Sequence, residues 1–145
     1  GGGGRPRAPP GPWCSCCAPG VAPSGRPIRD ARRQGIPITP FTVMMHDVDR
    51  AITDGQDDGF VKIHLEDGTD RILGGTIVAS HASEMINELS LAITSGIGLR
   101  ALAKVIHTYP NQADAIKMAA KAYNRARLAP TLKTLSGRWL AWRRR

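Results

Sequence analysis

The sequence predicts an α+β fold in which a small antiparallel sheet packs against helices. Two segments of β character, residues 60–65 and 71–80, flank a polar turn of sequence Glu-Asp-Gly-Thr-Asp. Segments of helical character follow these strands instead of alternating with them. Strands followed by helices are typical of α+β domains, whereas a doubly wound sheet requires alternation. No run of about eighteen apolar residues is present, so the sequence predicts no membrane span.

The strands are predicted from β-branched runs and from alternation. Residues 29–34 are expected to end a short helix that a glycine stops. Residues 36–45 are β-branched and apolar, and Pro37 and Pro40 favour an edge strand there. Residues 60–65 alternate apolar and polar side chains, which is the period of a half-buried strand. The buried side of the sheet is expected to come largely from Phe60, Ile63, Leu65, Ile72, Ile77 and Val78.

The helices are predicted from apolar residues that recur every three or four positions. Residues 82–94 place Met85, Leu89 and Ile93 on one face, and residues 99–106 form a short helix. Residues 111–127 form a longer helix whose inward stripe is Ile116, Ala119, Ala120 and Tyr123. A proline at position 130 is expected to interrupt the chain before a last amphipathic helix, whose apolar side is Leu132, Leu135, Trp139 and Trp142.

Composition divides the chain into three parts. Residues 1–27 are rich in Gly, Pro and Arg and poor in residues that fill a core, so we expect a disordered tail. Residues 28–130 have the composition of a folded domain, and residues 131–145 are expected to form a basic amphipathic helix. The net charge is +8, of which residues 1–35 carry +5 and residues 128–145 carry +5, while the residues between them carry −2.

The basic ends leave a second class of function open. A basic patch is typical of proteins that bind nucleic acid or an acidic surface. A small adaptor that binds nucleic acid or a membrane surface through its charged tails is therefore the alternative interpretation. The last helix could lie on an anionic membrane or dock on the domain's own sheet. Because the central domain is close to neutral, we expect no nucleic acid as partner of the domain itself.

Three cysteines lie close together in the proline-rich segment, at Cys14, Cys16 and Cys17. A zinc site usually needs two spaced pairs of ligands, and no second pair follows. We interpret these cysteines as free thiols and expect no metal site. Free thiols favour a cytoplasmic location.

Four blocks of the sequence resemble a known family. They are residues 59–63 (Gly-Phe-Val-Lys-Ile), 71–78 (Arg-Ile-Leu-Gly-Gly-Thr-Ile-Val), 81–89 (His-Ala-Ser-Glu-Met-Ile-Asn-Glu-Leu) and 105–114. In this order they resemble the C-terminal dimerisation domain of pyridine nucleotide-disulfide oxidoreductases, the family of glutathione reductase, dihydrolipoamide dehydrogenase and mercuric reductase. The resemblance covers about residues 29–128, and a tyrosine at position 109 favours the mercuric-reductase-like branch.

The resemblance implies a homodimeric parent enzyme that uses FAD and NAD(P)H. The family's Gly-x-Gly-x-x-Gly turn and its Cys-x4-Cys pair are both missing from this sequence. We therefore expect a fragment that binds neither cofactor and is inactive without the FAD and NAD(P) domains of the parent. The family's usual first strand is also expected to be missing, because residues 1–27 occupy its place and do not resemble it.

The resemblance also implies the candidate site residues. Where the family has a histidine that serves the partner subunit's redox thiol, this sequence has Tyr109, and the matching acid is Asp114. A phenol with a pKa of about 10 is a poor base at neutral pH, but it can donate a hydrogen bond or assist a bound metal. The candidate catalytic residues are Tyr109, Asp114 and His107, and Tyr109 and Pro110 are the candidates to lie near the partner subunit's FAD.

Each of these residues also has a structural interpretation. Asp114 is suited to the first turn of a helix capped by Asn111, where an acid is stabilising. His107 is either a surrogate base or a hydrogen-bonded structural histidine. Glu84 and Glu88 are expected on the solvent-facing side of their helix as surface or interface charges. The apolar surface of residues 81–97, centred on Met85 and Leu89, either packs inside one chain or, as we favour, forms the dimer interface.

Overall fold

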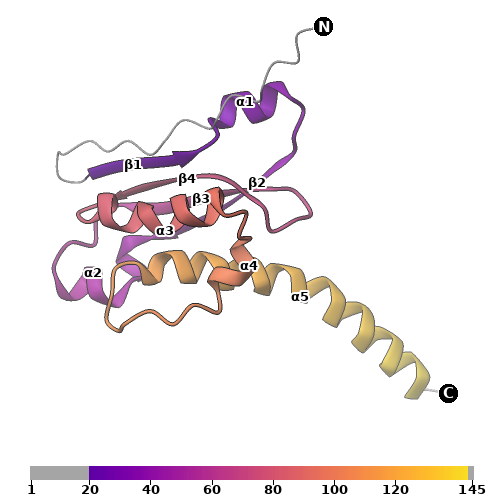
Figure 1. The fold of residues 1–145 in the computed structure, drawn as a ribbon. Helices are drawn as coiled ribbons and strands as arrows, with labels where there is room; N and C mark the ends of the chain where they lie inside the picture. The colour runs from indigo at the N-terminus through magenta and orange to yellow at the C-terminus, as the bar shows by residue number, and fades with distance from the viewer. Residues whose placement is uncertain (1–19, 144–145) are drawn as a thin grey trace, which may run out of the picture.

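A four-stranded antiparallel sheet forms the centre of the domain, which confirms the predicted α+β class (Figure 1). The computed structural model describes the backbone of residues 20–143 and the side chains of residues 20–128. The strand order is β1-β4-β3-β2, so β2 lies at an edge as its prolines predict. The strands are β1 (Gly20–Gly25), β2 (Ile38–Met44), β3 (Phe60–Glu66) and β4 (Ile72–Ala79).

The helices cover mainly one face of this sheet. They are α1 (Ile28–Arg33), α2 (Asp49–Thr53), α3 (Ala82–Thr94), α4 (Leu99–Leu102) and α5 (Asp114–Arg143), with a 3-10 turn at Met45–Asp47. Helix α3 packs on β1 and β4, whereas α5 packs on β2 and β3. Figure 1 shows α4 between α3 and α5, at the end from which a long connection returns to the start of α5. Within the described residues, no helix is both long and apolar enough to cross a membrane.

The core lies between the sheet and these two helices. Four of the six predicted sheet residues, Ile63, Leu65, Ile72 and Ile77, are at most 5% exposed. The other two, Phe60 and Val78, were assigned to the wrong face. They pair with each other on the opposite, half-buried side, and Val61 takes the inward position in their place. Successive side chains of a strand point to opposite faces of the sheet. An assignment that is off by one residue therefore places a side chain on the wrong face.

Strand β1 corrects two expectations at once. Residues 20–25 pair with β4 from Gly20–Ala79 to Gly25–Gly74, so this part of the segment expected to be disordered is an ordered strand, and the sheet's first strand is present. The strand has no bulky β-branched pattern, and its inward positions hold small side chains such as Ala22 and Ser24. Residues 1–19 of the expected tail lie outside the described residues.

Helix α3 has the predicted bounds, Ala82–Thr94, but its apolar face points inward. Met85 is 4% exposed and Leu89 is fully buried, because both side chains belong to the core of the chain itself. The expected dimer interface around these two residues is therefore wrong. On the outer side of the same region, Leu91 is 64% exposed and Ile97 is 39% exposed.

Helix α5 is longer than predicted. Its inward stripe of Ile116, Ala119, Ala120 and Tyr123 is buried as expected. The helix runs from Asp114 to Arg143, so the predicted break at Pro130 is wrong. A proline removes one intrahelical hydrogen bond, which does not by itself end a helix of 30 residues. The side chains of the expected amphipathic segment, 131–145, lie outside those that the structure describes.

Candidate functional site

The connection between α4 and α5 carries the candidate site residues. It contains His107, Tyr109 and Pro110 in irregular backbone, and the Tyr109–Pro110 peptide bond is cis. Its side chains contact two other elements, α3 and α2, which fixes the segment relative to the core. The predicted short helix over 99–106 covers only Leu99–Leu102, so the connection consists of residues 103–113.

His107 fastens the connection to α3. Its Nε2 lies 2.9 Å from Oε2 and 3.1 Å from Oε1 of Glu88, and the two side chains are 9% and 23% exposed. A carboxylate can only accept hydrogen bonds, so Nε2 is the donor. The other ring nitrogen, Nδ1, is buried without a hydrogen-bond partner among the described residues. Glu88 is therefore not the free surface charge that the sequence predicted, since it is the hydrogen-bond partner of a nearly buried histidine.

Tyr109 lies two residues further on and is 74% exposed. Its hydroxyl donates a hydrogen bond of 2.9 Å to Oδ2 of Asp49, the first residue of α2. This hydrogen bond is the main reason that the pKa of Tyr109 is raised, because it is made only by the protonated phenol. The charge of Asp49, partial burial and the charge of Asp114 raise the pKa of Tyr109 further. Tyr109 therefore keeps its proton at neutral pH.

Asp114 begins α5, where its charge suits the first turn of the helix. Asn111 supplies the local cap, since its Oδ1 accepts a hydrogen bond of 2.9 Å from the backbone N–H of Ala113. Among the described residues, the Tyr109 hydroxyl donates a hydrogen bond to Asp49 and none to Asp114. The geometry thus favours the helix-start interpretation of Asp114 over a Tyr109–Asp114 dyad.

The three predicted residues do come together around one surface hollow. His107, Tyr109 and Asp114 line a hollow of about 350 Å³. Its remaining walls are Asp47, Val48, Asp49, Lys117, Met118 and Lys121. Sequence reasoning missed Asp49 and Glu88 as partners of the site, because they lie 60 and 19 residues from the side chains that they bind. No local pattern in the sequence marks such long-range pairs.

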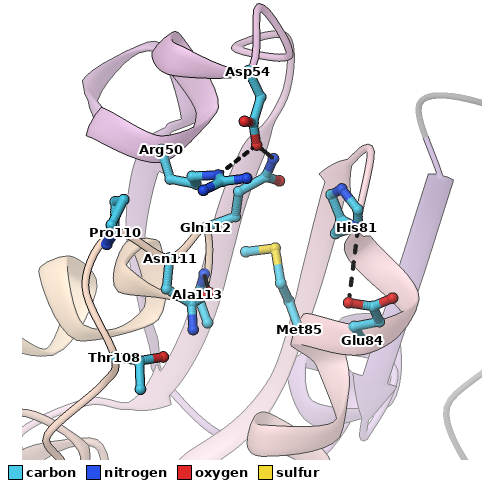
Figure 2. Close-up of a pocket in the computed structure, with 10 residues that line it drawn as sticks. All are labelled: Arg50, Asp54, His81, Glu84, Met85, Thr108, Pro110, Asn111, Gln112 and Ala113. Atoms are coloured by element: carbon cyan, nitrogen blue, oxygen red, sulfur yellow. Dashed lines mark hydrogen bonds and ion pairs between the residues drawn. The ribbon is translucent and has the colours of Figure 1, made fainter.

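A second hollow, of about 380 Å³, is lined in part by Pro110 (Figure 2). Arg50 Nε donates to Asp54 Oδ2 at 2.8 Å, and this hydrogen bond is the main reason that the pKa of Asp54 is lowered. Gln112, which is 5% exposed, points its Nε2 at the same carboxylate at 3.4 Å and at Oε1 of Gln56 at 3.5 Å. Figure 2 shows the Arg50, Asp54 and Gln112 side chains pointing toward one another. The second hollow thus ties the base of the connection to α2.

The described residues contain no group of three or more His, Cys, Asp or Glu side chains that could hold a metal ion. The three cysteines fall outside the described part of the chain. All three strand pairings are antiparallel. A dinucleotide site needs a glycine-rich turn between a strand and a helix of a parallel βαβ unit, and the described residues form no such unit. The described residues therefore offer no site of this kind for FAD or NAD(P)H.

Comparison with known proteins agrees with this geometry. Residues 11–120 match the family described as pyridine nucleotide-disulphide oxidoreductase, dimerisation domain. A dihydrolipoyl dehydrogenase from Halobacterium salinarum is 37% identical over 103 residues, which are 71% of this chain and 22% of that protein. A mercuric reductase from Shigella flexneri is 31% identical over 107 residues, which are 74% of this chain and 19% of that protein. The chain thus spans about a fifth of the length of these relatives.

The fold has counterparts among solved structures. LpdA from Mycobacterium tuberculosis superposes with a TM-score of 0.71 at 26% identity, over 77% of this chain and 24% of that one. The HOCl-induced flavoprotein disulfide reductase RclA from Escherichia coli superposes with a TM-score of 0.72 over 79% of this chain and 26% of that one. At 23% identity, the second likeness concerns the fold alone.

Proposed function

This chain belongs to the dimerisation-domain family of the pyridine nucleotide-disulphide oxidoreductases, and we propose that it pairs two subunits of a flavin-dependent NAD(P)H oxidoreductase. In this proposal the connection that carries Tyr109 and Pro110 faces the flavin and redox cysteines of the partner subunit. FAD and NAD(P)H are held by other domains of the parent. The parent is of the kind named dihydrolipoyl dehydrogenase or mercuric reductase, and Tyr109 favours the second.

The observation that carries this proposal is an exposed apolar segment on an anchored backbone. Ile106 is 92% exposed, although its neighbour His107 is almost buried against Glu88. Leu91 lies one turn after Glu88 on α3 and is 64% exposed. Two exposed apolar side chains thus lie close in sequence to the two partners of the His107–Glu88 hydrogen bond, and we call Leu91 and Ile106 together the Leu91–Ile106 patch. Such patches favour a partner that removes them from water.

The chemistry assigned to this chain is substrate binding rather than proton shuttling. The bound flavin of the parent would supply electron transfer between nicotinamide and substrate. Tyr109 is protonated at neutral pH, because a phenol's ordinary pKa of about 10 lies well above 7 and the hydrogen bond to Asp49 raises the pKa of Tyr109 further. His107 has its Nε2 engaged by Glu88 and its Nδ1 buried, so neither nitrogen is free to accept a substrate proton. We therefore assign His107 to holding the connection and Tyr109 to contacting the substrate.

Sedimentation velocity over a wide concentration range tests the proposal. We expect the purified chain to form a dimer, and we expect Leu91→Asp or Ile106→Asp to shift it to the monomer because each places a charge in the patch. Leu128→Asp is the matched control, since Leu128 is 59% exposed on a different helix, α5. A folded wild-type chain that stays monomeric at the highest concentration would reject the proposed function. A control variant that dissociates as readily as the patch variants would reject the patch.

A further inference from the structure

Tyr109 has one direct hydrogen-bond partner among the described side chains, and it comes from a distant part of the sequence. Asp49 is the first residue of α2, and its Oδ2 lies 2.9 Å from the Tyr109 hydroxyl. We propose that Asp49 is the positioning residue of Tyr109, and that it accepts the hydrogen bond of the phenol O–H so that the lone pairs of the phenol oxygen face a bound substrate. This inference rests on the proposed function, because it concerns how the site around Tyr109 recognises its substrate.

The position of Asp49 is set by buried neighbours. Val48 and Ala51, on either side of it in sequence, are 2% and 0% exposed and belong to the core. At the other end of α2, Asp54 accepts hydrogen bonds from Arg50 and Gln112. Helix α2 is therefore held at both ends by contacts that do not involve Tyr109. A partner on such a fixed element can orient an exposed phenol that has no packing of its own.

The other charged groups around the hollow interact with Tyr109 more weakly than Asp49 does. They are Asp47, Asp114, Lys117 and Lys121, with His107 turned toward Glu88. Asp114 acts on the phenol through its charge alone, and its effect on the pKa of Tyr109 is smaller than that of the Asp49 hydrogen bond. The sequence resemblance assigns the role of orienting Tyr109 to Asp114. In our inference Asp49 has this role instead.

This arrangement decides what the phenol can bind. A hydroxyl has one proton to donate and two lone pairs that accept. When the phenol O–H donates to Asp49, the oxygen offers only acceptor positions to a ligand. A substrate group that brings a proton or a positive charge then fits beside Tyr109 without disturbing the pair. A thiolate, which needs a donor, would have to compete with the Asp49 carboxylate for the same proton.

Titration of Tyr109 in the isolated chain tests the assignment. The sequence contains two tyrosines, and Tyr123 is 5% exposed, so 3-fluorotyrosine labelling yields two fluorine NMR signals that Tyr109→Phe assigns. Fluorination also lowers phenol pKa values into a range where alkali is less damaging. We expect Asp49→Asn to lower the pKa of Tyr109 clearly, and Asp114→Asn or Asp47→Asn to lower it less. Asp49 is exposed, so its variant should fold, and the unchanged Tyr123 signal verifies this.

Two outcomes would overturn the inference. One is a Tyr109 titration that Asp49→Asn leaves unchanged while the chain stays folded. The other is an effect of Asp114→Asn or Asp47→Asn as large as that of Asp49→Asn, which would show general charge rather than the hydrogen bond. The result is independent of the sedimentation experiment. A monomeric chain with an Asp49-dependent Tyr109 would reject the proposed function alone, and a dimer with an Asp49-independent Tyr109 would reject this inference alone.

Discussion

Nε2 of His107 lies 2.9 Å from Oε2 of Glu88, and this contact joins the connection before α5 to the middle of α3. It is the means by which a segment with a 92% exposed isoleucine keeps a defined place on the surface. A nearly buried ionisable pair of this kind is costly to break from one side, because the remaining partner loses its hydrogen bond without regaining full contact with water.

His107→Ala should therefore lower the free energy of unfolding by about 1–3 kcal/mol, because it leaves the Glu88 carboxylate without its donor. Urea denaturation followed by circular dichroism measures this change. His81→Ala is the matched control, since the His81 side chain is 47% exposed and lies 3.7 Å from Glu84. Equal effects of the two substitutions would contradict the anchoring role of His107.

Leu89→Ala and Leu91→Ala should separate stability from association within one helix. Leu89 is fully buried, so its truncation should lower the free energy of unfolding by about 2–5 kcal/mol. Leu91 is 64% exposed, so its truncation should change that free energy by no more than about 0.5 kcal/mol. The second variant should instead weaken the dimer in sedimentation experiments at matched concentrations. Comparable losses of stability would contradict the orientation of α3.

Gly25→Ala should test the edge strand β1. The φ angle of Gly25 is 87°, and an added Cβ would lie 2.6 Å from the carbonyl oxygen of Leu73. Gly55 also has a positive φ, 63°, but its Cβ would meet nothing within 4 Å. Gly55→Ala should cost the conformational strain of about 1–2 kcal/mol. Gly25→Ala should cost about 1–3 kcal/mol more, through the added clash. Thermal denaturation of both variants measures the difference, and equal midpoints would argue against the pairing of β1 with β4.

His64 should make the fold less stable in mild acid. Burial lowers the pKa of His64, and the positive charges of Lys62 and Arg32 lower it further. The unfolded chain, with a histidine pKa of about 6.5, then takes up a proton more readily than the folded chain. The stability that the neutral ring provides is complete above about pH 6.5 and declines as the pH falls through the lower, folded-state pKa.

Urea denaturation at pH 7.5 and pH 5 measures this effect. His64→Gln should lose less stability between the two pH values than the wild type, because the substituted residue does not titrate. His46→Gln is the control, since the His46 side chain is 59% exposed, and it should keep the wild-type difference. If the His64 variant lost as much stability between the two pH values as the wild type, another group would cause the loss of stability in acid.

Local patterns in the sequence determined most of the architecture. The bounds of α3, the inward stripe of α5 and four of the six core residues of the sheet follow from periods of 3.6 and 2, since these positions face a core whatever covers them. Strand β1 was not predicted by these periods. Its residues, Gly-Val-Ala-Pro-Ser-Gly, have little β preference, and they form a strand because β4 offers an open edge that accepts small side chains at close approach.

The sequence by itself determined which residue types stand in the candidate site, because Tyr109, Pro110 and Asp114 follow one another in a segment that resembles a known family. Only the tertiary structure decided what each of them does. The partner of Tyr109 is 60 residues away on α2, and the partner of His107 is 19 residues away on α3. Such pairs arise from how helices pack on the sheet. A hydrogen bond reaches about 3 Å, so it depends on final positions in space that no local period encodes.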